Sequence, residues 1–154
     1  MSTTVAADGE ELCGPSRAVA GAVLTIDLGA LRENYRRLRA RLGGARCAGV
    51  VKADGYGLGA SFVAEALVKD GCDSFFVAHA GEGVDLRAAL GPGPAIHVLN
   101  GLPPGSEDDA AAAGLIPVLN SRGQLEAWRA CARRLGRRLP AAVQVDSGMS
   151  RLGM

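Results

Sequence analysis

The sequence predicts an α/β fold built around a parallel sheet. From residue 47 onward, five short apolar runs alternate with four longer segments, and such alternation is typical of parallel strands joined by crossover helices. The runs are apolar at almost every position, which indicates strands with both faces covered. Two architectures fit, a doubly wound sheet or a (β/α)8 TIM-type barrel. About five strands are too few to close a barrel, so the chain would be an open sheet or the first part of a barrel.

The segment before residue 47 has a different character. Residues 1–20 are small and polar without a period, so we expect a flexible leader, followed by a folded unit over 21–154. A β-rich run predicts a short strand at 23–27. Asp27 can then cap a helix over 28–42, in which apolar residues recur every three or four positions and arginines occupy the opposite face.

The remaining elements follow from the same alternation. Strands are expected where apolar and β-branched residues run together, at 47–52, 74–78, 95–99, 116–119 and 141–146. Helices are expected between them, where glycines close segments of helical spacing, at 61–69, 80–90, 108–113 and 122–135. Parallel packing would align the carboxyl ends of all five strands, which is the edge where α/β proteins carry their functional groups.

Composition excludes several classes of function. The 154 residues are 48% hydrophobic with a formal net charge of +1 and 4% aromatic residues, which gives no support for a nucleic-acid or membrane partner. No apolar run reaches the ~18 residues of a membrane span, and no secretory signal is recognisable. The four cysteines lack zinc-ligand spacing, so we expect reduced thiols, no metal site and a cytoplasmic location.

Lys52 is the most informative residue, because it ends a predicted strand directly before three glycines spaced two apart. Burial among Val50, Val51 and Ala53 would favour the neutral amine that attacks an aldehyde. The loop could hold a phosphate, although its spacing matches neither a dinucleotide site nor a P-loop. These features favour a pyridoxal phosphate site in which Lys52 is the covalent anchor and the Tyr56 hydroxyl donates a hydrogen bond to the phosphate. The alternative is a lysine that reaches water beside a packed tyrosine.

Lysine is also rare in this chain, since Lys52 and Lys69 are the only two among 17 basic residues. Arginine evidently serves wherever a positive charge suffices. A lysine retained at a strand end therefore points to what arginine cannot do, which is to lose a proton and form a Schiff base.

A second loop follows the last predicted strand. Arg151 could bind the carboxylate of an amino-acid substrate through two parallel hydrogen bonds, although a loop arginine is more often a surface charge. Asp146 is expected to fix its own turn. His79 and His97 show no catalytic partner in the sequence, so we expect both to be structural.

Several stretches resemble the alanine racemase family. Residues 51–59 (VKADGYGLG) are similar to its pyridoxal-phosphate signature, and residues 145–153 (VDSGMSRLG) resemble its second signature. Shorter similarities occur at 26–35, 82–87 and 117–121. The resemblance covers about residues 22–154, with both long motifs in the family's order and separation.

The resemblance implies a (β/α)8 barrel starting at residue 47, a later β-rich domain that includes the 23–27 strand, and a homodimer. It implies pyridoxal-phosphate-dependent interconversion of L-alanine and D-alanine, supplying D-alanine for peptidoglycan. Lys52 would hold the cofactor and act as base on one face of the alanine α-carbon. Tyr56 would bond the phosphate, and Arg151 would lie near the cofactor's phenolic oxygen and the substrate carboxylate.

The sequence departs from the family pattern at three places. Leu58 stands where many members have histidine, and Gln144 stands where some have a carbamylated lysine that positions the arginine; the Gln144 amide could still accept a bond from Arg151. The sequence also ends at Met154, before the last barrel strands, the C-terminal β domain and the tyrosine that serves the opposite substrate face. We therefore expect an incomplete barrel, an unpaired edge strand at 141–146 and an inactive truncated chain.

Other readings remain open at this point. The chain could belong to a racemase with another or broader range of amino acids, since most residues of the substrate pocket would lie beyond Met154. It could also be a non-catalytic pyridoxal-phosphate-binding barrel protein, although such proteins complete the barrel and the Arg151 motif argues against them. A non-functional truncated product is a further alternative.

Overall fold

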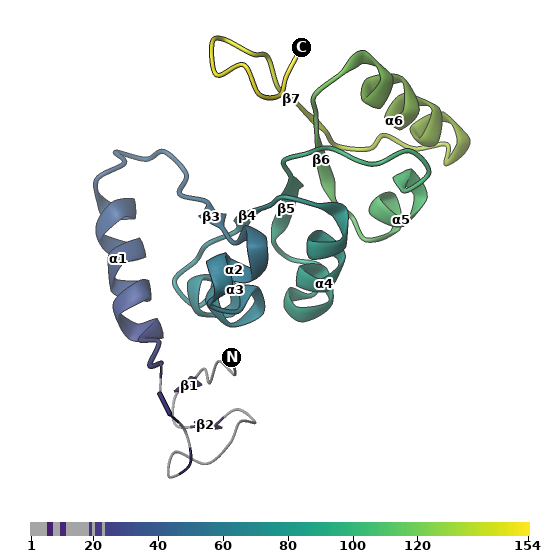
Figure 1. Ribbon diagram of the computed structural model, residues 1–154. Coiled ribbons are helices and arrows are strands. Elements are labelled where there is room, and N and C mark those ends of the chain that lie inside the picture. The colour runs from purple at the N-terminus through teal and green to yellow at the C-terminus, as the bar shows by residue number, and fades with distance from the viewer. Residues whose placement is uncertain (1–5, 8–9, 12–18, 20, 23) are drawn as a thin grey trace.

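The structure of the chain is a computed structural model that describes residues 6–7, 10–11, 19, 21–22 and 24–154. Five strands form one parallel sheet in which sequence neighbours are spatial neighbours, in the order β3-β4-β5-β6-β7. Their bounds are Gly49–Val50 (β3), Ser74–Val77 (β4), Ala95–Val98 (β5), Ile116–Leu119 (β6) and Ala142–Val143 (β7). The strands follow an arc (Figure 1), so the sheet is curved like one side of a barrel.

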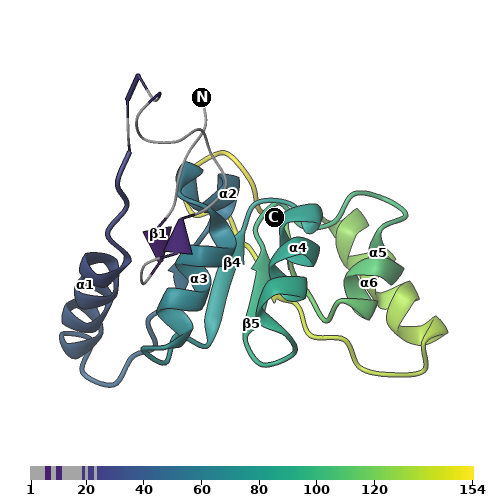
Figure 2. The same ribbon diagram turned by 90° about the horizontal axis from the view of Figure 1, so that it is seen from below.

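Helices connect successive strands and run along the outer side of the arc (Figure 1). Asp27 caps the first helix as predicted, since its side chain accepts the N–H of Ala30 at 2.8 Å. That helix, α1, packs against the helix α3 that follows the glycine loop (Figure 2). The predicted helices are confirmed to within two residues at each end, and a short further helix occupies the glycine loop. The bounds are Leu28–Ala40 (α1), Lys52–Gly57 (α2), Ala60–Val68 (α3), Ala80–Leu90 (α4), Glu107–Ala112 (α5) and Arg122–Arg134 (α6).

The face of the sheet that the helices cover forms the core. Phe75 pairs with Ile96 and Val77 pairs with Val98, and all four side chains are fully buried. Leu86 of α4 belongs to the same cluster. Burial of such side chains is the main favourable contribution to folding.

The opposite face of the sheet carries none of the described helices. Val50 pairs with Phe76, which in turn pairs with His97, and alternation along the strands turns all three away from the helices. Val50 is 46% exposed, and Phe76 and His97 are half-buried. A doubly wound sheet would carry helices on both faces, so the structure is a partial (β/α)8 barrel, as predicted.

Three predicted segments differ from the structure. Residues 24–27 form no strand, and Val23 lies outside the described residues; within the described part of the chain no strand lies beside them, and a single strand has no partner for its backbone groups. The outer strands are shorter than predicted, two residues each rather than 47–52 and 141–146. Both lie at sheet edges with one neighbour, so half of their backbone groups lack a pairing partner.

The predicted leader falls largely outside the described residues. Of residues 1–20, the structure describes 6–7, 10–11 and 19. Two short strands, Ala6–Ala7 (β1) and Glu10–Glu11 (β2), pair antiparallel with each other.

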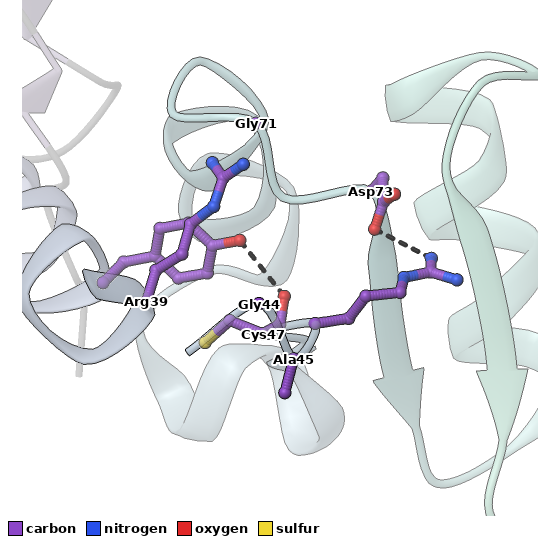
Figure 3. Close-up of a pocket in the computed structure, with 8 residues that line it drawn as sticks. Arg39, Gly44, Ala45, Cys47, Gly71 and Asp73 are labelled. Atoms are coloured by element: carbon purple, nitrogen blue, oxygen red, sulfur yellow. Dashed lines mark hydrogen bonds and ion pairs between the residues drawn. The ribbon is translucent and has the colours of Figure 1, made fainter. Parts of the chain in front are cut away.

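A cavity of about 240 Å³ lies at the amino-terminal end of β3, opposite the end that leads into Lys52 (Figure 3). The Tyr35 hydroxyl donates to the carbonyl of Cys47 at 3.1 Å, and Arg46 pairs with Asp73 at 2.9 Å. Burial, with the nearby Cys72 thiol, raises the pKa of Tyr35 to about 12. Each of these polar groups thus has a partner within the chain. The amino-terminal face of such a barrel contributes to stability rather than to catalysis, so we assign the cavity a structural role.

The described cysteines are free thiols: Cys47 is half-buried, and Cys72 and Cys131 are buried. This agrees with the prediction of reduced thiols for these three residues, whereas Cys13 lies outside the described residues. Among the described helices, none has the length and hydropathy needed to cross a membrane.

We predict that Leu86→Ala lowers the free energy of unfolding by about 2–5 kcal/mol, because Leu86 is 2% exposed and its loss leaves a cavity beneath α4. Urea denaturation followed by circular dichroism measures the change. The matched control is Val84→Ala on the same helix, where the side chain is 41% exposed and the expected change is within about 0.5 kcal/mol. Equal effects of the two substitutions would contradict the assignment of the core.

Candidate active site

Lys52 lies two residues after the end of β3, directly after Val51, whose N–H donates to the carbonyl of Phe76 in β4 at 2.9 Å. Its predicted burial is wrong. Val51 is 1% exposed, but Lys52 is half-buried and both Val50 and Ala53 are exposed. The reason is tertiary: Val50 points to the sheet face that has no helices, and Ala53 already belongs to the next turn. Lys52 is therefore accessible to a small molecule at the carboxyl edge of the sheet.

The backbone after Lys52 winds in the left-handed sense. Ala53, Asp54, Gly55 and Tyr56 have φ between 53° and 61° and ψ between 35° and 51°. Glycine tolerates this region, but other residues pay about 1–2 kcal/mol each. The sequence predicted a loop here, and neither composition nor spacing revealed that three non-glycine residues share this strained conformation.

Specific contacts hold the left-handed turn. The N–H of Gly55 bonds the carbonyl of Val51 at 2.9 Å, and the carboxylate of Asp54 accepts the N–H of Ala60 at 2.8 Å. The second bond satisfies a free amide at the start of α3. Gly55 is also buried against α3, where an added Cβ would lie 3.2 Å from the backbone nitrogen of Ala60. Strain of this kind persists only where the surroundings hold it, and it is concentrated at functional sites.

The side chains of Tyr56 and Lys52 lie on the same side of the turn. The Lys52 Nζ lies 6.0 Å from the centroid of the Tyr56 ring, and the tyrosine is 63% exposed. An exposed large aromatic residue does not contribute to the core. The structure thus places an amine and a phenol next to each other at an open strand end.

Glu82 is a residue of this site whose contacts the sequence reasoning missed. It lies in the first turn of α4, and its two carboxylate oxygens accept the N–H groups of Ala53, Ala78 and His79 at 2.7, 2.7 and 3.1 Å. Partial burial acts to raise its pKa, but the three backbone donors prevail and lower it. The available signal was a glutamate three positions after a helix N-cap, which is the capping-box spacing. That signal predicts the contact within the helix, but not the one to Ala53.

The second motif forms a turn after β7. Asp146 accepts the N–H groups of Gly148 and Ser150 at 2.9 and 3.0 Å, which confirms that it fixes its own turn and which lowers its pKa. Arg151 is exposed. The contact that the Gln144 amide could make with Arg151 is not formed: the Gln144 amide nitrogen donates to the carbonyl of Leu152 at 2.9 Å. Within the described residues, no hydrogen bond or ion pair joins Arg151 to Lys52.

Both histidines contact other residues of the fold. His97 stacks on Phe76 with ring centroids 4.6 Å apart and planes at 17°, and burial followed by the charge of Arg46 lowers its pKa. His79 is the N-cap of α4, and one of its ring nitrogens lies 3.5 Å from the Asn100 amide nitrogen.

A cavity of about 590 Å³ lies behind the left-handed turn, between that turn and α4. Acidic side chains at its lining belong to Asp54, Glu82 and Asp85. Two of these carboxylates already bond backbone N–H groups of the turn and its neighbours. The cavity therefore adjoins the lysine turn from the helix side rather than from the open side.

Backbone strain is confined to the two motifs. The non-glycine residues with positive φ in the described part of the chain are Ala53, Asp54, Tyr56 and Ser150. The first three lie between 51 and 59, and the fourth lies between 145 and 153. Strained residues cluster at active sites and ligand-binding loops. Their positions therefore indicate the same two stretches that the sequence motifs predict as sites.

The curved parallel sheet, the one-sided helices and the strained strand-end turns define part of a (β/α)8 barrel with a site at its carboxyl edge. The chain belongs to the alanine racemase family: residues 26–154 match the family model described as alanine racemase, N-terminal domain.

Curated relatives support the same family. The chain is 70% identical over 139 residues to a catabolic alanine racemase of Mesorhizobium japonicum, which covers 90% of this chain and 36% of the relative. It is 56% identical over 135 residues to an alanine racemase of Brucella ovis, covering 88% of this chain and 34% of the relative. The chain thus spans about a third of the length of these relatives.

Solved structures agree with the fold. The alanine racemase of Bartonella henselae with covalently bound pyridoxal phosphate superposes with a TM-score of 0.80 at 43% identity, over 83% of this chain and 37% of that one. The alanine racemase of Streptomyces coelicolor gives a TM-score of 0.78 at 36% identity, over 83% of this chain and 34% of that one.

We predict that Gly55→Ala lowers the free energy of unfolding by about 1–2 kcal/mol. The alanine backbone would be held at a φ of 61°, and the added methyl group would lie in tight contact with α3. Gly81→Ala in α4 is the control, since Gly81 has open space around it, and alanine there favours the helix by about 0.5–1 kcal/mol. Urea denaturation compares the two. A stabilising effect of Gly55→Ala would show that the left-handed turn is absent in solution.

Proposed function

We propose that this chain provides the cofactor-binding part of a pyridoxal-phosphate-dependent racemase that interconverts L-alanine and D-alanine. The observation that carries the proposal is the strained left-handed turn that presents the half-buried Lys52 beside the exposed Tyr56. Three strained non-glycine residues in one turn support a functional role, because such strain clusters at active sites and ligand-binding loops. The family and the covalently bound cofactor of the Bartonella henselae relative point to the chemistry.

The residues present fit this cofactor. The Lys52 amine is accessible for a covalent bond to the cofactor's aldehyde carbon, and the Tyr56 hydroxyl is exposed as a donor for its phosphate. Pyridoxal phosphate, when bound, serves as an electron sink that stabilises a carbanion at the substrate α-carbon.

Lys52, Tyr56 and Arg151 each have a role in the proposed reaction. Lys52 anchors the cofactor and moves a proton to or from one face of the α-carbon, because a lysine amine can release a proton and an arginine cannot. Tyr56 orients the phosphate. Arg151, exposed on the turn that Asp146 fixes, would bind the substrate carboxylate and would contribute its positive charge to the phenolic side of the cofactor.

Racemisation also needs an acid or base on the opposite face of the α-carbon. We propose that this second group comes from outside these 154 residues, in keeping with relatives of which this chain covers about a third. We further propose a homodimer as the assembly of the complete protein and the cytoplasm as its location. Alanine is the proposed substrate, with no nucleic-acid or membrane partner.

The proposed role in the cell is to supply D-alanine for peptidoglycan. The name of the Mesorhizobium japonicum relative, a catabolic alanine racemase, favours a second role in the use of alanine as a nutrient. Disruption of the gene separates the two. A requirement for added D-alanine supports the first role, and loss of growth on alanine as carbon source without that requirement supports the second.

We predict that pyridoxal phosphate followed by borohydride reduction labels Lys52 in preference to Lys69, because the amine of Lys52 is presented at the proposed site. Peptide mapping by mass spectrometry measures the ratio of the two labels. Lys69, which is exposed beyond the end of α3, is the control within the same chain. Equal labelling of the two lysines would remove the case for a specific site.

We predict that a polypeptide of these 154 residues binds the cofactor at Lys52 but does not racemise alanine, because it supplies a proton-transferring group for one face of the α-carbon alone. Chiral chromatography of L-alanine incubated with polypeptide and cofactor measures the conversion. Formation of D-alanine above a Lys52→Arg control would show that the second group lies within this chain.

A further inference from the structure

We propose that Glu82 is a positioning residue for Lys52, a proposal that rests on the function proposed above. One carboxylate connects two neighbouring strand ends: Oε1 accepts the N–H of Ala53, which directly follows Lys52, and Oε2 accepts the N–H groups of Ala78 and His79 after β4. Glu82 thereby ties the residue after the proposed anchor to the adjacent strand of the sheet.

The three contacts require an ionised carboxylate. All three partners are N–H donors, at 2.7 Å, 2.7 Å and 3.1 Å, and a carboxylate can accept on both oxygens without presenting a hydrogen of its own. A glutamine of the same shape would turn an N–H₂ group toward at least one of these donors. The pattern of donors therefore selects glutamate over its isosteric amide.

We call a side chain that hydrogen-bonds two neighbouring strand ends in this way a bridge. A second bridge joins the ends of β5 and β6, and there one of the two bonds is donated rather than accepted by the side chain. Gln124 occupies the same position in the first turn of α6 that Glu82 occupies in α4. Its Oε1 accepts the N–H of Asn120 at 2.8 Å, and its Nε2 donates to the carbonyl of Asn100 at 3.1 Å. Here the neighbouring strand end offers a carbonyl, so the bridge needs an amide. The side chain in each case matches the groups it joins.

The Glu82 bridge differs from the Gln124 bridge in what it holds. Ala53 is the first residue of the left-handed turn, so the bond from Glu82 fixes the point at which the strained backbone starts. Without it, the Ala53 N–H loses its acceptor and the turn can relax toward the right-handed conformation that alanine and aspartate prefer. Relaxation would change the direction in which Lys52 and Tyr56 leave the end of β3.

The test is Glu82→Gln in the chain, with two readouts. Amide hydrogen exchange by NMR reports the bridge without any cofactor, and we expect the Ala53 amide to exchange roughly 5- to 100-fold faster than in the unsubstituted chain. Labelling with pyridoxal phosphate and borohydride reports the position of the amine, and we expect the ratio of Lys52 to Lys69 label to fall several-fold.

Two controls separate positioning from stability. Gln124→Glu breaks the bridge between β5 and β6 by an equally small change and is expected to leave the Lys52 to Lys69 ratio intact. Asp85→Asn removes a charge from an exposed position of the same helix and is expected to change neither readout. If Glu82→Gln does not fold, Glu82→Asp keeps the charge and shortens the reach to Ala53, and the same two readouts apply.

The outcomes are distinct. Unchanged exchange at Ala53 would overturn the bridge, and faster exchange with an unchanged labelling ratio would overturn the positioning role. An equal loss of Lys52 labelling in Gln124→Glu would also overturn it, because the effect would then be one of general stability. Equal labelling of both lysines in the unsubstituted chain would instead refute the proposed function, and the exchange of the Ala53 amide would still test the bridge.

Discussion

Parallel pairing of β3 to β7 is the constraint on which the rest of the structure depends. Because every strand runs in the same direction, every connection that leaves a strand begins at the same edge of the sheet. The strands themselves are short, two to four residues each. The backbone groups just beyond the strands therefore need other partners, and side chains from the first turns of the following helices supply them.

Those side chains show how the edge is organised. Glu82 and Gln124 occupy equivalent positions in α4 and α6, and each reaches its own strand end and the end of the preceding strand in the sheet. Gln124 also approaches Gly101, where a φ of 69° favours glycine and an added Cβ would meet the glutamine side chain. The edge is thus a connected set of turns, and the geometry of one turn constrains the next.

Strain is placed on this edge, although the chain as a whole is otherwise regular. A left-handed run with three non-glycine residues costs roughly 3–6 kcal/mol by itself, a large fraction of the stability of a typical domain. It is held by backbone bonds, by the carboxylates of Asp54 and Glu82, and by burial of Gly55 against α3. The resulting turn holds Lys52 and Tyr56 next to each other, which an extended strand would not do at this spacing.

The sequence by itself determined the α/β class, the helices to within two residues, the Asp27 cap and the two motifs, because these depend on local spacing and on residue chemistry. The tertiary structure decided which predicted strands exist: among the described residues, 24–27 has no neighbouring strand to pair with, and the outer strands are short because each has one neighbour. It also decided that Lys52 is half-buried rather than buried, because one sheet face carries no helix. The Ala53 N–H and the Glu82 carboxylate that accepts it lie 29 residues apart in sequence, and only the pairing of β3 with β4 brings them together.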